Sequence, residues 1–202
     1  MFLTLILSSL LTFVELNCEN LFDTRHDSLK NDVEFLPEGS YKWTPYRYWT
    51  KLNHLGQEIV AQSNSIPDFV AMCEVENDSV MFDLTKRSLL RNAGYEYVMT
   101  SSPDERGIDV ALLYQPASFA LLHSHSIRIK PLPDTRPTRD ILYASGLIIT
   151  GDTLHVFVVH APSRRGGEQV SRPYRLQVAS QLAEAVDSVY AISRDAKIII
   201  AG

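Results

Sequence analysis

The order in which short apolar segments and helix-like segments follow one another constrains the fold of this chain most. Runs of Val, Ile, Leu and aromatic residues bounded by polar or turn-forming residues predict strands at 11–16, 68–73, 95–100, 110–114, 119–129, 141–150, 154–160 and 197–201. Apolar positions at helical spacing predict helices at 47–64, 77–94 and 173–190. Strands mixed with helices, with hairpins in the middle, indicate an α/β or α+β layered sandwich rather than a purely parallel sheet.

Two local signals refine this picture. The pair Gly151-Asp152, between the strands predicted at 141–150 and 154–160, predicts a tight hairpin. The final run KIIIA, at 197–201, is so apolar that we expect it in the centre of a sheet.

Composition narrows the class of protein. The chain has 202 residues, of which 45% are hydrophobic, and this is typical of one globular domain. Its formal net charge of −5 argues against a protein that coats DNA through a basic surface. The same charge is compatible with a nuclease, because a bound divalent cation adds local positive charge.

The two cysteines, Cys18 and Cys73, are too few for a disulfide framework or a zinc cluster. Both lie in apolar runs, which favours two buried thiols. The alternative, a single disulfide between them in an exported protein, stays open at this point.

The first eleven residues, MFLTLILSSLL, resemble the apolar part of an export signal. The run is shorter than the ~20 residues that a transmembrane helix needs, so we expect no stable membrane insertion. We favour export, to the periplasm or the medium, over the alternative of a displaced start codon and a cytoplasmic protein. The domain itself is expected to occupy 12–202.

Polar side chains follow three of the predicted strands at the point where each strand ends. These are Asn17 in LNCENLFD, Glu74 in MCEVEN and His160 in VVHAPSRRGGE. Layered α/β folds place ligands at such strand ends. A carboxylate together with a carboxamide offers the hard oxygen ligands that suit Mg²⁺ or Mn²⁺ rather than zinc.

Each residue taken alone also has a structural interpretation. Glu74 could complement the dipole of a following helix, Asn17 could cap a turn, and a lone His160 at a strand end is more often structural than catalytic. The pair Arg164-Arg165 could belong to a solvated loop. The argument for function therefore depends on the combination.

The combination is specific. The strings NCENLFD, PDFVAMCEVEN, RGIDVALLY and VVHAPSRRGGE, a helix containing SRPYR, and KIIIAG follow one another in the order and spacing of one branch of the endonuclease/exonuclease/phosphatase superfamily. The run YRYWTKLNHLGQEI also looks like the first helix of that branch. The chain resembles this superfamily over almost its whole length beyond the apolar start. The resemblance implies a four-layer α/β/β/α sandwich.

The resemblance also implies roles for individual residues. Glu74 matches the glutamate that ligates the metal, and Asn17 matches the asparagine beside the metal and the scissile phosphate. His160 matches the histidine that holds or protonates the phosphate, and Asp109 occupies a motif in the same cleft, where it acts in catalysis or orients other side chains. The residues expected to contact substrate phosphate are Arg106, Ser163, Arg164 and Arg165.

The activity implied is hydrolysis of phosphodiester bonds with Mg²⁺ or Mn²⁺, and nucleic acid is the favoured substrate class. The alternatives are a phospholipid or small-phosphoester phosphatase, and an inactive remnant or module that binds phosphate-bearing ligands. Family members continue after a strand like KIIIAG with an Asp-x-Asn segment and a later Asp-His pair. We therefore expect this chain to be the N-terminal portion of the domain, with the C-terminal part of the site missing.

Overall fold

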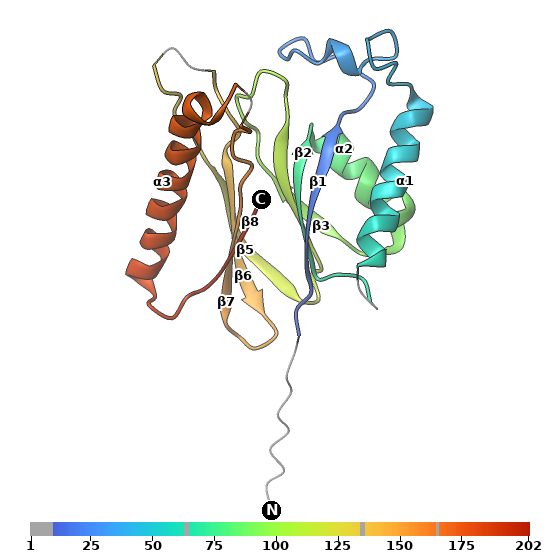
Figure 1. The fold of residues 1–202 in the computed structure, drawn as a ribbon. Helices are drawn as coiled ribbons and strands as arrows, with labels where there is room; N and C mark the ends of the chain where they lie inside the picture. The colour runs from blue at the N-terminus through green and yellow to red at the C-terminus, as the bar shows by residue number, and fades with distance from the viewer. Residues whose placement is uncertain (1–9, 63–64, 134–135, 165) are drawn as a thin grey trace, which may run out of the picture.

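The computed structural model describes residues 10–62, 65–133, 136–164 and 166–202. Two four-stranded sheets pack face to face, with α1 and α2 covering the outer face of one sheet and α3 covering the outer face of the other (Figure 1). This arrangement confirms the predicted four-layer α/β/β/α sandwich. Most residues of the predicted apolar start lie outside the described residues.

The first sheet has the order β1-β2-β4-β3, in which β1 and β2 are parallel and the other pairs are antiparallel. Its strands are β1 (Phe13–Leu21), β2 (Phe69–Val75), β4 (Asp109–Tyr114) and β3 (Glu96–Met99). β1 is longer than predicted, because Asn17, Glu19 and Asn20 continue the strand instead of leaving it.

The second sheet has the order β5-β6-β7-β8. Its strands are β5 (Phe119–Ile127), β6 (Ile141–Ile148), β7 (Thr153–Val158) and β8 (Lys197–Ala201). Gly151 closes the predicted hairpin between β6 and β7, with a backbone φ of 84° and an N–H that donates to the Ile148 carbonyl at 2.8 Å. Within the described residues β8 pairs only with β7, in parallel, so it lies at an edge of this sheet and not in its centre as predicted.

The first helix, α1 (Pro45–Ala61), starts where the sequence favours a start. The Thr44 side chain accepts from the Arg47 N–H and Pro45 takes the first helical position. The buried positions of α1 recur on one face at helical spacing, and they are Tyr48, Leu52, Leu55, Gly56 and Ile59.

The predicted helix at 77–94 is not continuous. It comprises α2 (Asp78–Phe82), capped by Asn77, then a π-helical turn at Asp83–Arg87 and a 3₁₀ turn at Leu89–Asn92. The break falls at Ser88, whose backbone is extended and whose hydroxyl oxygen accepts from the Leu90 N–H. Helix α3 (Glu168–Ile192) begins five residues before the predicted start, so Pro173 lies inside it.

Three apolar cores hold the layers together. One lies between the two sheets, one between the first sheet and α1 and α2, and one between the second sheet and α3. Cys18 belongs to the core beneath α1, whereas Cys73 belongs to the core between the sheets, so both are free buried thiols as predicted. Among the described residues, none of the helices combines the length and the apolar character needed to cross a membrane.

Candidate active site

A bulge in β2 sets the direction of the Glu74 side chain. The pairing of β2 with β4 shifts register between Cys73 and Val75, and Glu74 has a positive φ of 60°. Cys73 packs between the sheets and Val75 packs beneath the helices, which is ordinary alternation if Glu74 is counted as an extra residue. The carboxylate thereby faces the second sheet, where Glu74 Oε1 lies 3.2 Å from Nε2 of His160, two residues beyond β7.

The end of β1 is irregular in a matching way. Its pairing with β2 shifts register between Asn17 and Leu21, and Glu19 and Asn20 both have left-handed backbones, with φ of 50° and 62°. The Asn17 Oδ1 atom accepts from the Glu19 N–H at 2.8 Å, a local bond that stabilises such a turn. The Asn20 N–H donates to Glu74 Oε2 at 2.9 Å, so both carboxylate oxygens of Glu74 have partners.

Lys51 of α1 supports this turn from below. Its Nζ atom donates to the Glu19 carbonyl at 2.6 Å and lies 5.4 Å from the centre of the Trp43 ring. Burial lowers the pKa of Lys51, and the neighbouring Glu19 and Glu74 act in the opposite direction. Lys51 therefore links α1 to the turn that follows Asn17, and the Asn20 N–H of this turn donates to Glu74.

His160 is held by Arg139, which comes just before β6. The Arg139 guanidinium donates to the carbonyls of His160 at 3.0 Å and Ala161 at 3.2 Å, and its other end lies 3.5 Å from Asp104. Burial lowers the pKa of His160, the Arg139 charge lowers it further, and Glu74 opposes both. A carboxylate can only accept, so the imidazole nitrogen that faces Glu74 carries the proton.

These observations define a cluster that draws on both sheets: Asn17 where β1 becomes irregular, Glu74 in the bulge of the parallel strand β2, and His160 beyond a strand of the opposing sheet. Asn17 pairs with Cys73, the residue before Glu74, so the sheet places the Asn17 and Glu74 positions side by side. A profile of the Endonuclease/Exonuclease/phosphatase family matches residues 12–202. The chain belongs to this family.

Solved structures of other proteins share this fold. The catalytic domain of human Nocturnin with bound sulfate superposes with a TM-score of 0.61 at 18% identity, covering 94% of this chain and 63% of that one. The mannosyl-6-phosphatase of Bacteroides thetaiotaomicron gives 0.64 at 15% identity, with coverages of 94% and 63%. D. rerio TDP2 in complex with a single-strand DNA product gives 0.57 at 16%, with coverages of 94% and 58%.

At these identities the three likenesses show the fold. The chain spans roughly three fifths of the length of these structures, between 58% and 63%. No curated protein sequence matches the chain at a significant level.

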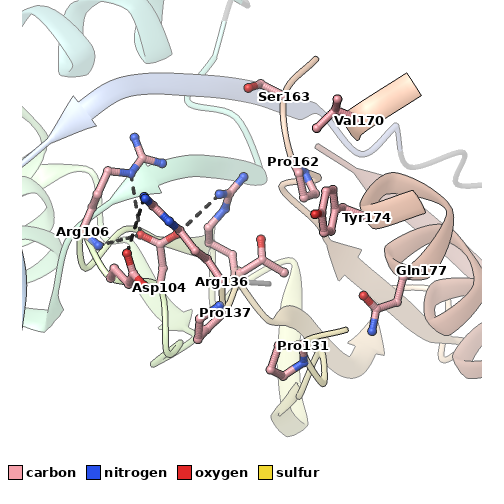
Figure 2. Close-up of a pocket in the computed structure, with 13 residues that line it drawn as sticks. Asp104, Arg106, Pro131, Arg136, Pro137, Pro162, Ser163, Val170, Tyr174 and Gln177 are labelled. Atoms are coloured by element: carbon pink, nitrogen blue, oxygen red, sulfur yellow. Dashed lines mark hydrogen bonds and ion pairs between the residues drawn. The ribbon is translucent and has the colours of Figure 1, made fainter. Parts of the chain in front are cut away.

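The residues predicted to contact substrate phosphate lie in different surroundings. Arg106 is half-exposed, and its guanidinium approaches Asn20 Oδ1 at 3.5 Å and Asp104 at 3.8 Å, so it borders the cluster. Ser163 lines a cavity that Arg106 also lines (Figure 2). Arg164 is exposed and lies 3.6 Å from Glu168 on α3. Arg165 lies outside the described residues.

Asp109 is buried and its contacts point to a positioning role. One oxygen, Oδ1, accepts from the Thr100 hydroxyl at 2.5 Å, from the Ser102 N–H at 2.9 Å and from the Ser102 hydroxyl. Burial raises the pKa of Asp109, and these hydrogen bonds partly offset the rise. Asp109 thus fastens the start of the loop that carries Arg106.

Sequence reasoning did not single out Arg139, Lys51 or Asn20. Arg139 lies in no motif that the strand ends suggested, and Lys51 occupies a position of an amphipathic helix that is usually exposed. Asn20 carried a signal, because asparagine tolerates the left-handed backbone better than most residues do. Its position in NCEN, three residues after Asn17, marks the turn.

Proposed function

We propose that this chain forms part of a divalent-metal-dependent hydrolase of phosphoesters, with phosphodiesters of nucleic acid as the favoured substrate. The observation that carries the proposal is the Glu74–His160 contact at 3.2 Å across the two sheets, made possible by the β2 bulge. A left-handed backbone at a non-glycine residue costs on the order of 1–3 kcal/mol and concentrates at functional sites. Glu74 has such a backbone, and family membership supports the same class of chemistry.

The donor set fits a hard cation. Glu74 supplies a carboxylate and Asn17 a carboxamide oxygen, and Mg²⁺ is commonly held by one or two carboxylates together with water and substrate phosphate. In the ranges that the structure describes, no group of three or more His, Cys, Asp or Glu side chains is placed to hold a metal ion. Glu74 and Asn17 would hold Mg²⁺ or Mn²⁺, which would stabilise negative charge on the phosphate oxygens.

The residues of the chain would then bind and orient the phosphoester. His160 would turn its Nε2–H away from Glu74, 3.2 Å from it in this structure, to donate to a phosphate oxygen beside the carboxylate. Arg106 would pair with a second oxygen, since its guanidinium is half-exposed beside Asn20. Arg139 holds the backbone that carries His160 and keeps the imidazole in place.

Hydrolysis of bis(p-nitrophenyl) phosphate and p-nitrophenyl phosphate by the purified chain tests the proposal. We expect release of p-nitrophenol that requires Mg²⁺ or Mn²⁺ and stops with EDTA. Glu74→Gln should lower kcat/KM by about 100-fold or more, the size expected for loss of a group that stabilises charge in the transition state. The matched control Glu184→Gln, exposed on α3, should stay within about twofold of wild type.

The two substrates separate the readings of the substrate class. Faster hydrolysis of the diester would favour a nuclease-like enzyme. The fold shared with TDP2 bound to single-strand DNA product motivates that preference. Faster hydrolysis of the monoester would favour a small-phosphoester phosphatase, in line with the mannosyl-6-phosphatase of similar fold. Binding of phosphate-bearing ligands without metal-dependent turnover would instead support a non-catalytic module and contradict the enzyme proposal.

A further inference from the structure

Two histidines lie side by side on β5, on the outer face of the second sheet that α3 partly covers (Figure 1). His123 pairs across the strands with Ser145 of β6, and His125 pairs with Tyr143. Residues directly opposite each other in a sheet share a face. Tyr143 packs against the core beneath α3, so both histidines point away from the first sheet. We call His123 and His125 the histidine pair.

A bulge in β5 sets the direction of the histidine pair. The pairing of β5 with β6 shifts register between Leu121 and His123, which leaves Leu122 as an extra residue. Leu121 packs against the core between the sheets, whereas His123 faces the opposite side two residues later. In a regular strand, residues two apart point to the same face. The bulge therefore turns the histidines outward, where both side chains are exposed to solvent.

The separation of the two imidazoles fits a shared metal ion. His123 Nε2 lies 3.0 Å from His125 Nδ1, and the ring centroids are 5.0 Å apart. Imidazole nitrogens bind Zn²⁺ at about 2.0–2.1 Å, so two of them at ligand angles of about 90–110° lie about 2.9–3.3 Å apart. The same separation suits a hydrogen bond from one neutral ring to the other. A metal ion would replace the bonding proton, once that ring shifts its proton to its other nitrogen.

The surroundings of the histidine pair favour a bound cation. Metal ligation needs the neutral imidazole, and partial burial and the neighbouring His123 both lower the pKa of His125. Glu184 of α3 and His125 line one cavity of about 400 Å³, so an acidic side chain lies on this side of the sheet to offset positive charge. The pair is also accessible, because among the described residues β5 pairs only with β6 and forms an edge of its sheet.

We propose that the histidine pair binds one divalent late transition-metal ion of the class Cu²⁺, Ni²⁺ and Zn²⁺. Imidazole nitrogen suits these ions, whereas Mg²⁺ prefers oxygen ligands. Over the described part of the chain, no third His, Cys, Asp or Glu is placed to complete a metal site, so water fills the remaining positions. Two ligands fixed on one strand are already oriented before the ion arrives. The proposal does not rest on the hydrolase activity, because it concerns another face of the molecule and another class of ion.

Calorimetric titration of the whole chain, without a polyhistidine tag, tests the inference with NiCl₂ in a buffer that contains excess MgCl₂. Excess Mg²⁺ competes for oxygen ligands and leaves imidazole sites free. We expect one Ni²⁺ to bind per chain, and CuCl₂ should bind more tightly than NiCl₂. Absence of binding by both ions would overturn the inference and leave the 3.0 Å contact as a hydrogen bond.

Single substitutions locate the bound ion. His123→Gln and His125→Gln keep polar side chains at exposed positions, and each should weaken Ni²⁺ binding about tenfold or more, because a chelate loses one of its two linked ligands. The matched control His54→Gln, exposed on α1, should bind Ni²⁺ as the wild type does. His160→Gln should also retain binding, which separates the histidine pair from the Glu74–His160 cluster. Equal binding by the wild type and both variants of the pair would overturn the inference.

Electron paramagnetic resonance of bound Cu²⁺ provides a readout of the ligands themselves. The wild type should show coupling to two equatorial nitrogens, and each variant of the histidine pair should show coupling to one. Circular dichroism melting curves close to that of the wild type would establish that the variants are folded. Coupling to fewer than two nitrogens in the wild type would overturn the inference, because the ion would then not be shared between His123 and His125.

Discussion

Asp109 offers the sharpest test of how the site is built. Among the described residues, the three hydrogen bonds of its side chain all go to a single oxygen, Oδ1. Asp109→Asn can keep that oxygen in place, so the bonds from Thr100 and Ser102 survive while the buried charge disappears. Asp109→Ala removes all three and leaves the buried Ser102 N–H without an acceptor.

The magnitudes follow from these contacts. A buried N–H left unpaired costs about 1–3 kcal/mol, and each lost hydrogen bond contributes about 1 kcal/mol. The two hydroxyls can rotate toward other acceptors, so we expect Asp109→Ala to destabilise the protein by about 2–4 kcal/mol. Asp109→Asn should lie within about 1 kcal/mol of wild type, because the hydrogen bonds remain.

The pH dependence carries a sign that can be checked. Burial raises the pKa of Asp109 in the folded protein above its usual value of 3.8. The folded state then holds the proton more tightly, so this contribution to stability is complete below pH 3.8 and is lost as the pH rises through the folded pKa. Asn does not titrate, and the stability of Asp109→Asn relative to wild type should therefore increase as the pH rises from 4 to 7.

Urea unfolding followed by circular dichroism between pH 4 and 7, together with hydrolysis of bis(p-nitrophenyl) phosphate, provides the measurement. For a positioning residue, Asp109→Asn should retain kcat within about threefold, since the loop that carries Arg106 stays fastened. A loss of more than about 100-fold in a variant of unchanged stability would refute the reasoning, because it would mean that Asp109 itself transfers a proton.

Three further results are expected. Lys51→Met should lower kcat/KM about tenfold and stability by about 1–2 kcal/mol, because the Glu19 carbonyl loses its cationic donor. An unchanged kcat/KM in activity assays would show that the contact from α1 does not matter for the site. Burial raises the pKa of Cys73 to about 12 and also raises that of Cys18, so Ellman's reagent should label neither thiol until the chain is unfolded in urea; fast labelling of the native protein would contradict their burial. Burial alone would raise the pKa of Asp68, but hydrogen bonds from Ser118 and Thr12 outweigh it and lower the pKa. The stability that this group contributes is therefore present above pH 3.8 and is lost as the pH falls. Acid unfolding of Asp68→Asn should show a weaker pH dependence than wild type between pH 5 and 2, and an identical profile would argue against the role of these bonds.

Strands β2 and β4 were predictable because their apolar runs are buried on both faces. The run at 197–201 became β8 with the predicted bounds, and the hairpin at Gly151 was marked by its turn residues. The predictions were wrong where polar residues take part in regular structure. β1 continues past Asn17 because Asn17 and Leu21 pair with β2 on either side of an irregular turn. The Asn20 N–H within that turn donates to Glu74, which is distant in the chain.

The candidate site was predictable as far as strand ends could indicate it. Asn17, Glu74 and His160 follow apolar runs, and this predicted that they lie at the ends of strands. The partners of these residues were not predictable in the same way. Arg139 reaches His160 through backbone carbonyls. Every residue type carries such a carbonyl, so the sequence gives no sign of this contact. The break at Ser88 depends on bonds within its own turn that apolar spacing does not reveal.

The bulge in β2 has a consequence for how such a site could arise or be lost. Met72, Cys73 and Val75 point alternately to the two faces of the sheet once Glu74 is left out, and Cys73 and Val75 pair with the adjacent residues Val110 and Asp109 of β4. Removal of the single Glu74 codon would thus give an uninterrupted β2–β4 ladder, with Cys73 and Val75 still facing their own layers. Gain or loss of the carboxylate that we propose as a metal ligand would then require one three-base insertion or deletion, with the core residues of β2 unchanged.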